Sequence, residues 1–198
     1  MRAILFSVLF IAASWVVTRP FMPIEQPPGV LIAKDPQQGE IVEDVSPLRV
    51  GDWVLQPLAT YLVQARVLGI KGYSSDGTSE IAPYDLLLGW GPMSDSAIVD
   101  DMTFDQRGRF GYWGLGRDCP ISESEVNHHV ANTHPIPAND QVRRQIASLK
   151  VGSLVRLRGY LVEARNPQGG APWRSSLTRT DLGDGACEII YVESISVW

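Results

Sequence analysis

Three histidines stand in one short segment, and two of them have the chemistry of catalytic or metal-binding groups. Imidazole titrates near neutral pH and is the commonest side chain bound to transition metals. His129 and His134 are therefore candidates for acid–base catalysis, or for metal ligation together with the carboxylate of Asp140. The helical zinc motif H-E-x-x-H is absent, and Pro135 favours an extended segment. The alternative is a loop whose histidines hydrogen-bond backbone groups, and no cofactor is expected.

The two cysteines, Cys119 and Cys187, form an even pair. In an exported protein such a pair predicts a disulfide, and a bond between distant cysteines would constrain the unfolded chain. Two buried free thiols are the alternative. A nucleophilic pair of Cys119 with one of the histidines is a further alternative, which a disulfide would prevent. The absence of C-x-x-C argues against a thioredoxin-type redox role.

Arginine and aromatic side chains gather in two segments that read as hairpins. Planar rings beside guanidinium groups can hold a peptide, a glycan or an anionic group. The alternative is that the rings fill the core and the arginines are solvated. The binding candidates are Arg107, Arg109, Tyr112 and Trp113 in the first segment, and Trp173, Arg174 and Arg179 in the second.

The charge and the remaining motifs exclude several classes of protein. The formal net charge is −5, with 17 basic and 22 acidic residues, and the arginines are scattered. Nucleic-acid binding needs clustered positive charge, so it is not expected. The sequence has no G-x-S-x-G, no P-loop, and no G-x-G-x-x-G that opens a helix. The 198 residues, 44% of them hydrophobic, are enough to build a folded domain.

The start of the chain predicts export. Arg2 precedes an uncharged apolar run, Ala3 to Val17. Residues 1–18 fit a signal peptide, or a membrane anchor of about 22 Å that a thinned bilayer could accommodate. Residues 19–43 are rich in proline and predict a spacer, in which Val30 to Ile32 could dock as an edge strand. We expect a periplasmic domain, soluble after cleavage or anchored in the inner membrane if the segment is retained.

Residues 44–198 predict a mainly β (α+β) domain that positions these side chains. Tyr61 to Ile70 and Tyr84 to Trp90 read as antiparallel strands, and Thr103 to Trp113 as a hairpin about Arg107-Gly108. Trp173 to Thr180 and Cys187 to Val192 read as a final hairpin. A helix is predicted to follow a cap at Asn139 or Asp140, because Val142, Ile146 and Leu149 recur at helical spacing.

Two similar segments favour a small curved barrel. Leu48 to Arg66 and Leu149 to Arg165 each run from "V-G" into a strand that contains "Y-L-V". They are either a true repeat or a common barrel pattern, in which a glycine turn leads into a bending strand. Both readings suit an OB-like barrel with one helix packed on it and an apolar helix at the N-terminus.

Three segments resemble a group of uncharacterised bacterial exported proteins. They are Asp85 to Asp95, Asn132 to Pro137, and Trp173 to Glu188. The resemblance implies an intact exported domain in a bacterial envelope and transfers no catalytic role.

The leading hypothesis from the sequence is a non-catalytic binding or assembly module of the bacterial envelope. Its partner would be an envelope protein, a peptide or a glycan, with the membrane as a further partner if the first segment is uncleaved. The alternative is a hydrolase that uses His129 and His134, with or without a metal.

Overall fold

The structure is a computed structural model that describes residues 22–42, 45–178, 181 and 185–198. The expected export segment, residues 1–18, and the candidate Arg179 lie outside the described residues. Within the described ranges, no helix is long and apolar enough to cross a membrane.

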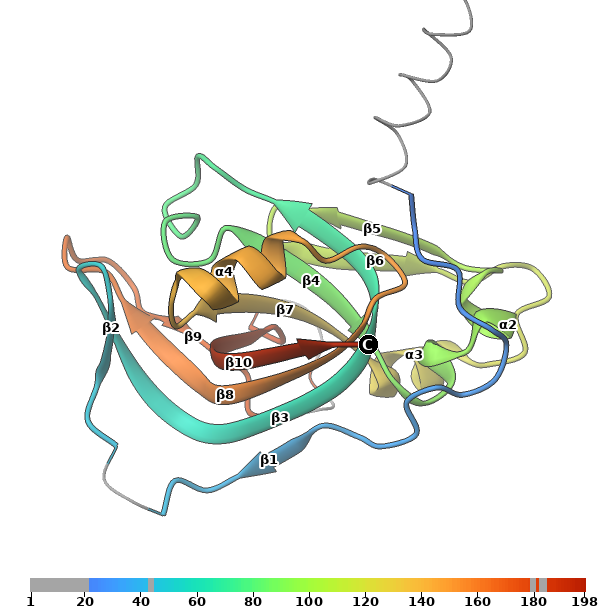
Figure 1. Ribbon diagram of the computed structural model, residues 1–198, viewed down its shortest axis with the longest axis horizontal. Helices are drawn as coiled ribbons and strands as arrows, with labels where there is room; N and C mark the ends of the chain where they lie inside the picture. Colours follow the sequence, from blue (N-terminus) through green and yellow to red (C-terminus); the bar gives the residue numbers. More distant parts are fainter. Residues whose placement is uncertain (1–21, 43–44, 179–180, 182–184) are drawn as a thin grey trace, which may run out of the picture.

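Five strands close into a ring, which Figure 1 shows as a curved wall. The order around the ring is β3 (Trp53–Gly72), β4 (Tyr84–Gly89), β7 (Val130–Pro137), β10 (Glu188–Val197) and β8 (Leu154–Arg165). A further pairing between β8 and the long strand β3 closes it. All neighbours in the ring are antiparallel except β7 and β10, which are parallel. The expectation of a mainly β, ring-shaped domain is confirmed.

The remaining elements lie around the ring. Three short strands extend its sheet, one hairpin forms a separate sheet, and the helices lie in the connections. Their bounds are β1 Gln37–Gly39, β2 Leu48–Val50, β9 Trp173–Arg174, β5 Thr103–Arg107, β6 Phe110–Gly114, η2 Gly91–Ser94, α2 Ser96–Val99, α3 Glu123–His129 and α4 Asp140–Ala147.

The two similar sequence segments become the two strands that close the ring. Gly51 and Gly152 have φ values of 57° and 89°, and each lies in the turn that leads into β3 or β8. Glycine adopts this left-handed conformation without steric cost, so the same short pattern starts both strands. β3 and β8 then pair antiparallel with each other over most of β8.

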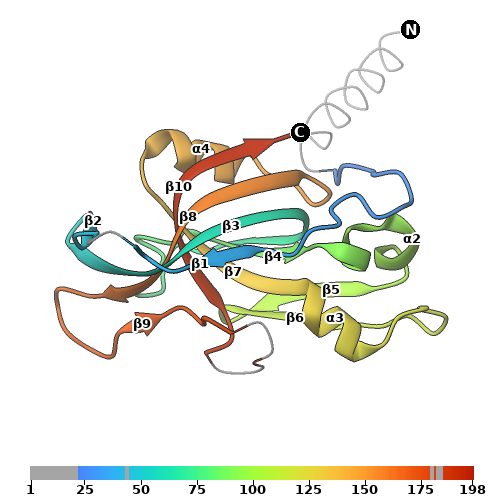
Figure 2. The ribbon, with the colours of Figure 1, turned by 90° about the horizontal axis from the view of Figure 1, so that it is seen from below.

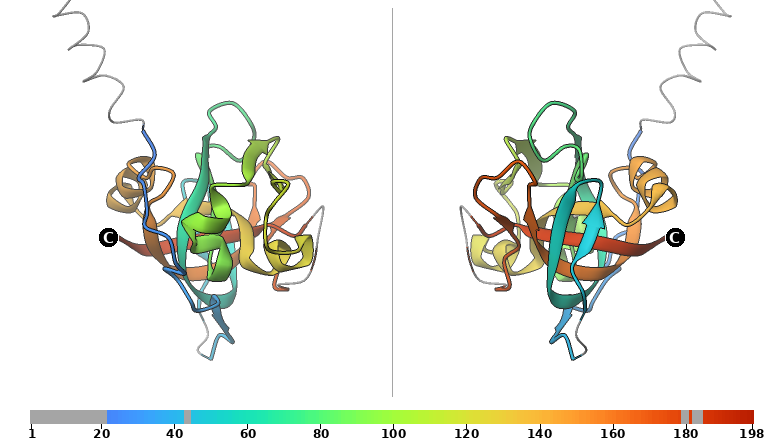
Figure 3. Two further views of the ribbon diagram at one scale, coloured as in Figure 1. Left: turned by 90° about the vertical axis from the view of Figure 1, so that its right-hand side faces the viewer. Right: turned by 90° about the vertical axis from the view of Figure 1, so that its left-hand side faces the viewer.

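The predicted helix is confirmed as α4, and it covers one side of the ring. The side chain of Asn139 accepts a hydrogen bond from the Val142 amide at 3.1 Å and caps the helix. Val142, Ile146 and the following Leu149 are buried in the main core with residues from the ring strands. Figures 2 and 3 show α4 on one side of the ring, with α3 and the β5–β6 hairpin on the opposite side.

The predicted hairpin is confirmed as β5 and β6, but its two-residue turn is Gly108-Arg109, one residue beyond the expected Arg107-Gly108. Gly108 and Arg109 both have positive φ values, 57° and 73°, as the tight hairpin turn of the primed type requires. Gly111 lets the hairpin lie close to the ring, because a Cβ there would meet the side chains of Leu87 and Asn132. The hairpin therefore adds a second layer over β4 and β7.

Two smaller expectations are wrong. Among the described residues of Trp173 to Thr180 and Cys187 to Val192, one backbone hydrogen bond, from Ser176 to Cys187, joins the two segments, but no strand pairing does: β9 pairs with β8, and β10 inserts between β7 and β8. Val30 to Ile32 is not a strand. It docks through the amides of Leu31 and Ile32, which donate to the Ser94 hydroxyl, and the edge strand next to β3 is β1 instead.

Candidate active site

A buried carboxylate at the start of β4 collects the polar side chains of the site. Asp85 is fully buried, and its Oδ1 accepts from Arg109 Nη1 at 2.7 Å. The same oxygen meets His134 Nδ1 at 2.7 Å. β4 and β7 are neighbours with Leu86 opposite Thr133, so the next pair along is Asp85 and His134. Sheet register therefore brings together two residues that are 49 positions apart in the sequence.

Arg109 reaches this carboxylate from the turn of the β5–β6 hairpin. Its Nη2 and Nε also pair with both oxygens of Asp76, at 2.8 and 3.0 Å, and its guanidinium lies 3.9 Å from the centre of the Tyr73 ring. Burial raises the pKa of Asp76, but hydrogen bonding from Arg109 and Thr78 outweighs it and lowers that pKa to about 2. Arg109 is thus a fixed internal cation between two carboxylates.

His134 is buried between this ion pair and the ring of Trp173, whose centre is 4.9 Å from that of the imidazole. Burial, the largest single effect, lowers the pKa of His134. Hydrogen bonding to Asp85 and interaction with the Cys187 thiol outweigh burial and raise the pKa to about 9. At neutral pH the imidazole is therefore protonated, with Nδ1 committed to Asp85.

Cys187 lies directly before β10, and its thiol interacts with the His134 imidazole. β10 joins β7 with Glu188 opposite Thr133, which places the preceding cysteine beside Asn132. The Asn132 amide nitrogen lies 3.5 Å from the Cys187 sulfur and donates to the Arg109 carbonyl oxygen at 2.8 Å. The carboxylate of Asp85 thus contacts the imidazole of His134, and the imidazole interacts with the thiol of Cys187.

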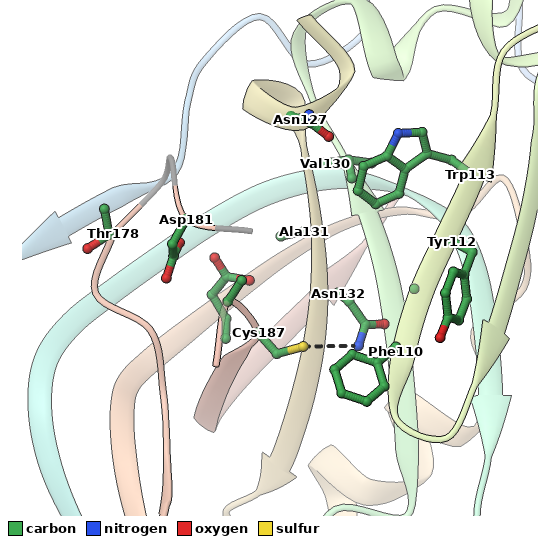
Figure 4. Close-up of a pocket in the computed structure, with 13 residues that line it drawn as sticks. Phe110, Tyr112, Trp113, Asn127, Val130, Ala131, Asn132, Thr178, Asp181 and Cys187 are labelled. Atoms are coloured by element: carbon green, nitrogen blue, oxygen red, sulfur yellow. Dashed lines mark hydrogen bonds between the residues drawn. The ribbon is translucent and has the colours of Figure 1, made fainter. Parts of the chain in front are cut away.

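The thiol faces a cavity of about 330 Å³. Figure 4 shows that the cavity lies between β6 on one side and β7 with the segment before β10 on the other. Aromatic and aliphatic groups form much of its wall, and the Oδ1 atom of Asn127 is buried there with no hydrogen-bond partner among the described residues. The described lining residues are Phe110, Gly111, Tyr112, Trp113, Asn127, Val130, Ala131, Asn132, Thr178, Asp181, Ala186, Cys187 and Glu188.

The structure does not bring the candidate catalytic or metal-binding residues His129, His134 and Asp140 together. His129 ends α3, and its Nδ1 meets the carbonyl oxygen of Glu125 at 2.8 Å. His134 lies five residues further along β7, a distance of about 16 Å in a strand. Asp140 is exposed in the first turn of α4. The described residues contain no group of three or more His, Cys, Asp or Glu that could hold a metal ion.

The arginine and aromatic candidates divide into internal and external groups. Tyr112 and Trp113 line the cavity, whereas Trp173 packs on His134. Arg107 is exposed, pairs with Asp105 at 2.8 Å and stacks on Tyr112. Arg174 pairs with Glu163 on β8 at 2.8 Å. The two hairpin segments therefore do not present one shared arginine surface.

The expected disulfide is absent, because Cys119 and Cys187 are both free thiols. Cys119 packs at the edge of the apolar cluster of Met102 and Val126, beneath α3. Cys187 lies beside Asn132 in the cavity wall. The two cysteines lie in different parts of the fold and are not within bonding distance of each other.

Sequence reasoning missed Asp85, Asp76, Asn132 and Cys187 as members of one site. The available signal was Asp85 itself, a charged residue directly before the apolar run of a buried strand. Charged side chains are rarely buried without a partner, so its position called for a cationic neighbour. No known protein family, curated protein or solved structure matches this chain.

Proposed function

We propose that the protein is a thiol-dependent hydrolase or acyl transferase with Cys187 as its nucleophile. The observation that carries this proposal is the contact of Asp85 with His134 and of His134 with Cys187, which lines a cavity of about 330 Å³. A nucleophile, an acid–base group and a group that orients the base are the parts that covalent acyl transfer needs.

Each side chain has a distinct role in this proposal. Asp85 holds His134 through Nδ1, which leaves Nε2 to exchange a proton with the reacting groups. His134 is the group that exchanges a proton with the Cys187 sulfur, because the thiol interacts with its imidazole. Arg109 holds Asp85 in turn and is itself held by Asp76.

The chemistry follows from these positions. Before attack the proton of the Cys187 thiol has passed to Nε2 of His134. The Cys187 sulfur then forms a bond to the substrate carbonyl carbon, and the carbonyl π electrons move to oxygen. When the tetrahedral intermediate collapses, the bond to the leaving group breaks and His134 supplies its proton, which leaves a thioester on Cys187. Water then loses a proton to His134 and attacks the thioester, and the sulfur leaves. An amine or alcohol in place of water gives transfer instead of hydrolysis.

Asn132 is the donor best placed for the oxyanion. Its amide nitrogen lies 3.5 Å from the sulfur, so an oxygen on a carbon bonded to that sulfur falls within its reach. Preorganised donors of this kind stabilise the charge that develops in the transition state. Gln106 fixes the amide by donating to Asn132 Oδ1 at 3.1 Å.

We also propose that the ring is an OB-type barrel. Its five strands and the helix α4 between β7 and β8 support this assignment. The second and third strands of OB barrels commonly carry the binding face, and β4 and β7 hold Asp85 and His134. This argument is an analogy of fold. We propose further that the domain works in the bacterial envelope, as the composition of residues 1–18 favours.

The binding-module hypothesis makes a different prediction for the same site. It requires no acyl-enzyme, and Arg107 and Arg109 would hold the partner. The internal pairing of Arg109 with Asp76 and Asp85 weakens that hypothesis, because the guanidinium is already engaged.

The test is acylation by p-nitrophenyl acetate. We expect a burst of p-nitrophenolate of one equivalent per chain and an acetyl group on Cys187 in the peptide map. Cys187→Ala should abolish the burst, and Cys119→Ala should retain it. His134→Gln should slow acetylation by at least about 100-fold. Equal acetylation of both cysteines, or no acetylation of Cys187, would overturn the proposal.

A further inference from the structure

We propose that the cavity binds an extended peptide, which adds as a strand beside β6 and presents a carbonyl to Cys187. The inference rests on the proposed function for the reaction, but the binding mode stands on separate features of the cavity wall. These features are the unpaired edges of two strands, an unpartnered acceptor at one end, and an aromatic wall.

The outer edge of β6 faces the cavity with unpaired backbone groups. In a hairpin with a two-residue turn the flanking residues, here Arg107 and Phe110, form a hydrogen-bonded pair, and such pairs alternate along the ladder. Tyr112 therefore also points its backbone groups toward β5. Gly111 and Trp113 point theirs away from β5, and both residues line the cavity. The described strands include none that pairs with this edge.

A second unpaired edge lies across the cavity on β7. β10 begins to pair with β7 only at Thr133, so the preceding residues Val130 to Asn132 have β4 on one side and the cavity on the other. A peptide in this space would lie between two strand edges. Strand addition to an open edge supplies affinity through main-chain hydrogen bonds.

The two ends of β6 fix the length of such a peptide. The Arg109 carbonyl, directly before β6, lies 3.9 Å from the Cys187 sulfur. Trp113 lies toward Asn127 at the other end of the cavity (Figure 4). Phe110 to Trp113 spans about 10 Å, or three residues of an extended chain. The substrate therefore places about three residues along β6 on one side of the reacting carbonyl.

The side chains of the cavity indicate what those three residues carry. Phe110 and Tyr112 are partly exposed large apolar groups, and with Trp113 they form an aromatic wall suited to aliphatic or aromatic side chains. At the far end Asn127 lines the cavity, and its buried Oδ1 accepts no hydrogen bond from the described residues. An apolar peptide fits the aromatic wall, and its main chain fits the open strand edges.

The experiment measures the binding of acetyl-trileucine amide to the full chain carrying Cys187→Ala, by calorimetry. Two matched probes are leucine amide and the same tripeptide N-methylated at its middle amide. We expect the tripeptide to bind at least about tenfold more tightly than either, which is the effect of one or two lost hydrogen bonds.

A pair of variants tests the edge itself. Trp113→Ala and Trp113→Pro both lack the indole, but only the proline variant lacks the backbone N–H on the open edge. That N–H makes no bond to β5, so the hairpin ladder is kept. We expect the proline variant to lose about tenfold in tripeptide affinity relative to the alanine variant.

Equal affinity for the tripeptide and its N-methylated form would overturn the peptide inference. That result would leave the acetylation of Cys187 in the native chain untouched. Conversely, failure of acetylation with tight, methylation-sensitive peptide binding would overturn the proposed reaction and keep the binding mode.

Discussion

The residue types of the Asp85 cluster each recur elsewhere in the molecule with only local contacts. The inner carboxylate, Asp85, binds an arginine and a histidine from two other elements, whereas Asp105 binds Arg107 and the Gln106 amide of its own strand. The side chains of Asp85 and Arg109 are 1% and 15% exposed, against 57% and 71% for the outer pair. The matched pairs, inner residue first, are Asp85 and Asp105, Arg109 and Arg107, His134 and His129, and Cys187 and Cys119.

The difference between the inner and outer pairs shows how burial changes the properties of the same side chains. An exposed ion pair is worth little, since water screens it and the side chains lose entropy. A buried pair is costly to break, because the remaining partner stays desolvated and uncompensated. The inner members are therefore held in fixed positions, and the pKa of His134 among them is raised, which are properties that catalysis needs.

The largest expected effect comes from removing the shared carboxylate. Asp85→Ala leaves the buried groups of Arg109 and His134 without their common partner, and we expect it to lower the free energy of unfolding by about 3–5 kcal/mol. Asp105→Ala should lower it by less than about 0.5 kcal/mol. Urea denaturation followed by tryptophan fluorescence measures both. A loss below about 1 kcal/mol for Asp85→Ala would show that the cluster is not held by this carboxylate.

The elements that depend on short stretches of sequence were predictable. The helix α4 follows from the spacing of Val142, Ile146 and Leu149, and the β5–β6 hairpin follows from the turn at Gly108. Both depend on residues within one turn or one hairpin. The ring could be anticipated because a glycine turn precedes each of the strands that close it.

The cluster itself could not be predicted, because it depends on sheet order. His134 meets Asp85 only through the pairing of β4 with β7, and Cys187 joins them only because β10 inserts between β7 and β8. The sequence pattern placed Cys187 at the start of a hairpin with Trp173 and therefore away from β7. The inward direction of Arg109 depends on its positive φ, which no propensity for arginine indicates.

The next largest effect is a pH dependence of the free energy of unfolding, to which His134 contributes and His129 does not. The pKa of His134 is about 9 in the folded chain, above its ordinary value of 6.5. The folded state therefore binds more protons than the unfolded state between these pH values. The stabilisation is complete below about pH 6.5 and is lost as the pH rises through 9, by about 3 kcal/mol at most.

Urea denaturation from pH 6 to pH 9.5 measures this dependence. His134→Gln should flatten the fall in the free energy of unfolding, and His129→Gln should leave it unchanged, since His129 contacts only the carbonyl of its own helix. An identical slope in the native chain and in His134→Gln would contradict the protonated state assigned to the buried imidazole.

The smallest expected effect on stability distinguishes a positioning role from a structural one. Gln106 is buried and donates to Asn132 Oδ1, while the Asn132 nitrogen faces the Cys187 sulfur. Without that donor, the amide orientation that presents nitrogen to the thiol loses one of its two supports, and the bond from the Asn132 nitrogen to the Arg109 carbonyl oxygen remains. Gln106→Met should cost about 1 kcal/mol of stability and slow the acetylation of Cys187 about tenfold.

A second glutamine supplies the control for this prediction. Gln145 on α4 donates to the Ile195 carbonyl oxygen at 3.4 Å, on the side of the ring away from the cavity. Gln145→Met should cost a similar or smaller amount of stability and leave the acetylation rate unchanged. If both variants slow acetylation equally, the rate follows general stability, and Gln106 does not act through Asn132. If only Gln106→Met slows it, the orientation of one buried amide controls the reactivity of the thiol.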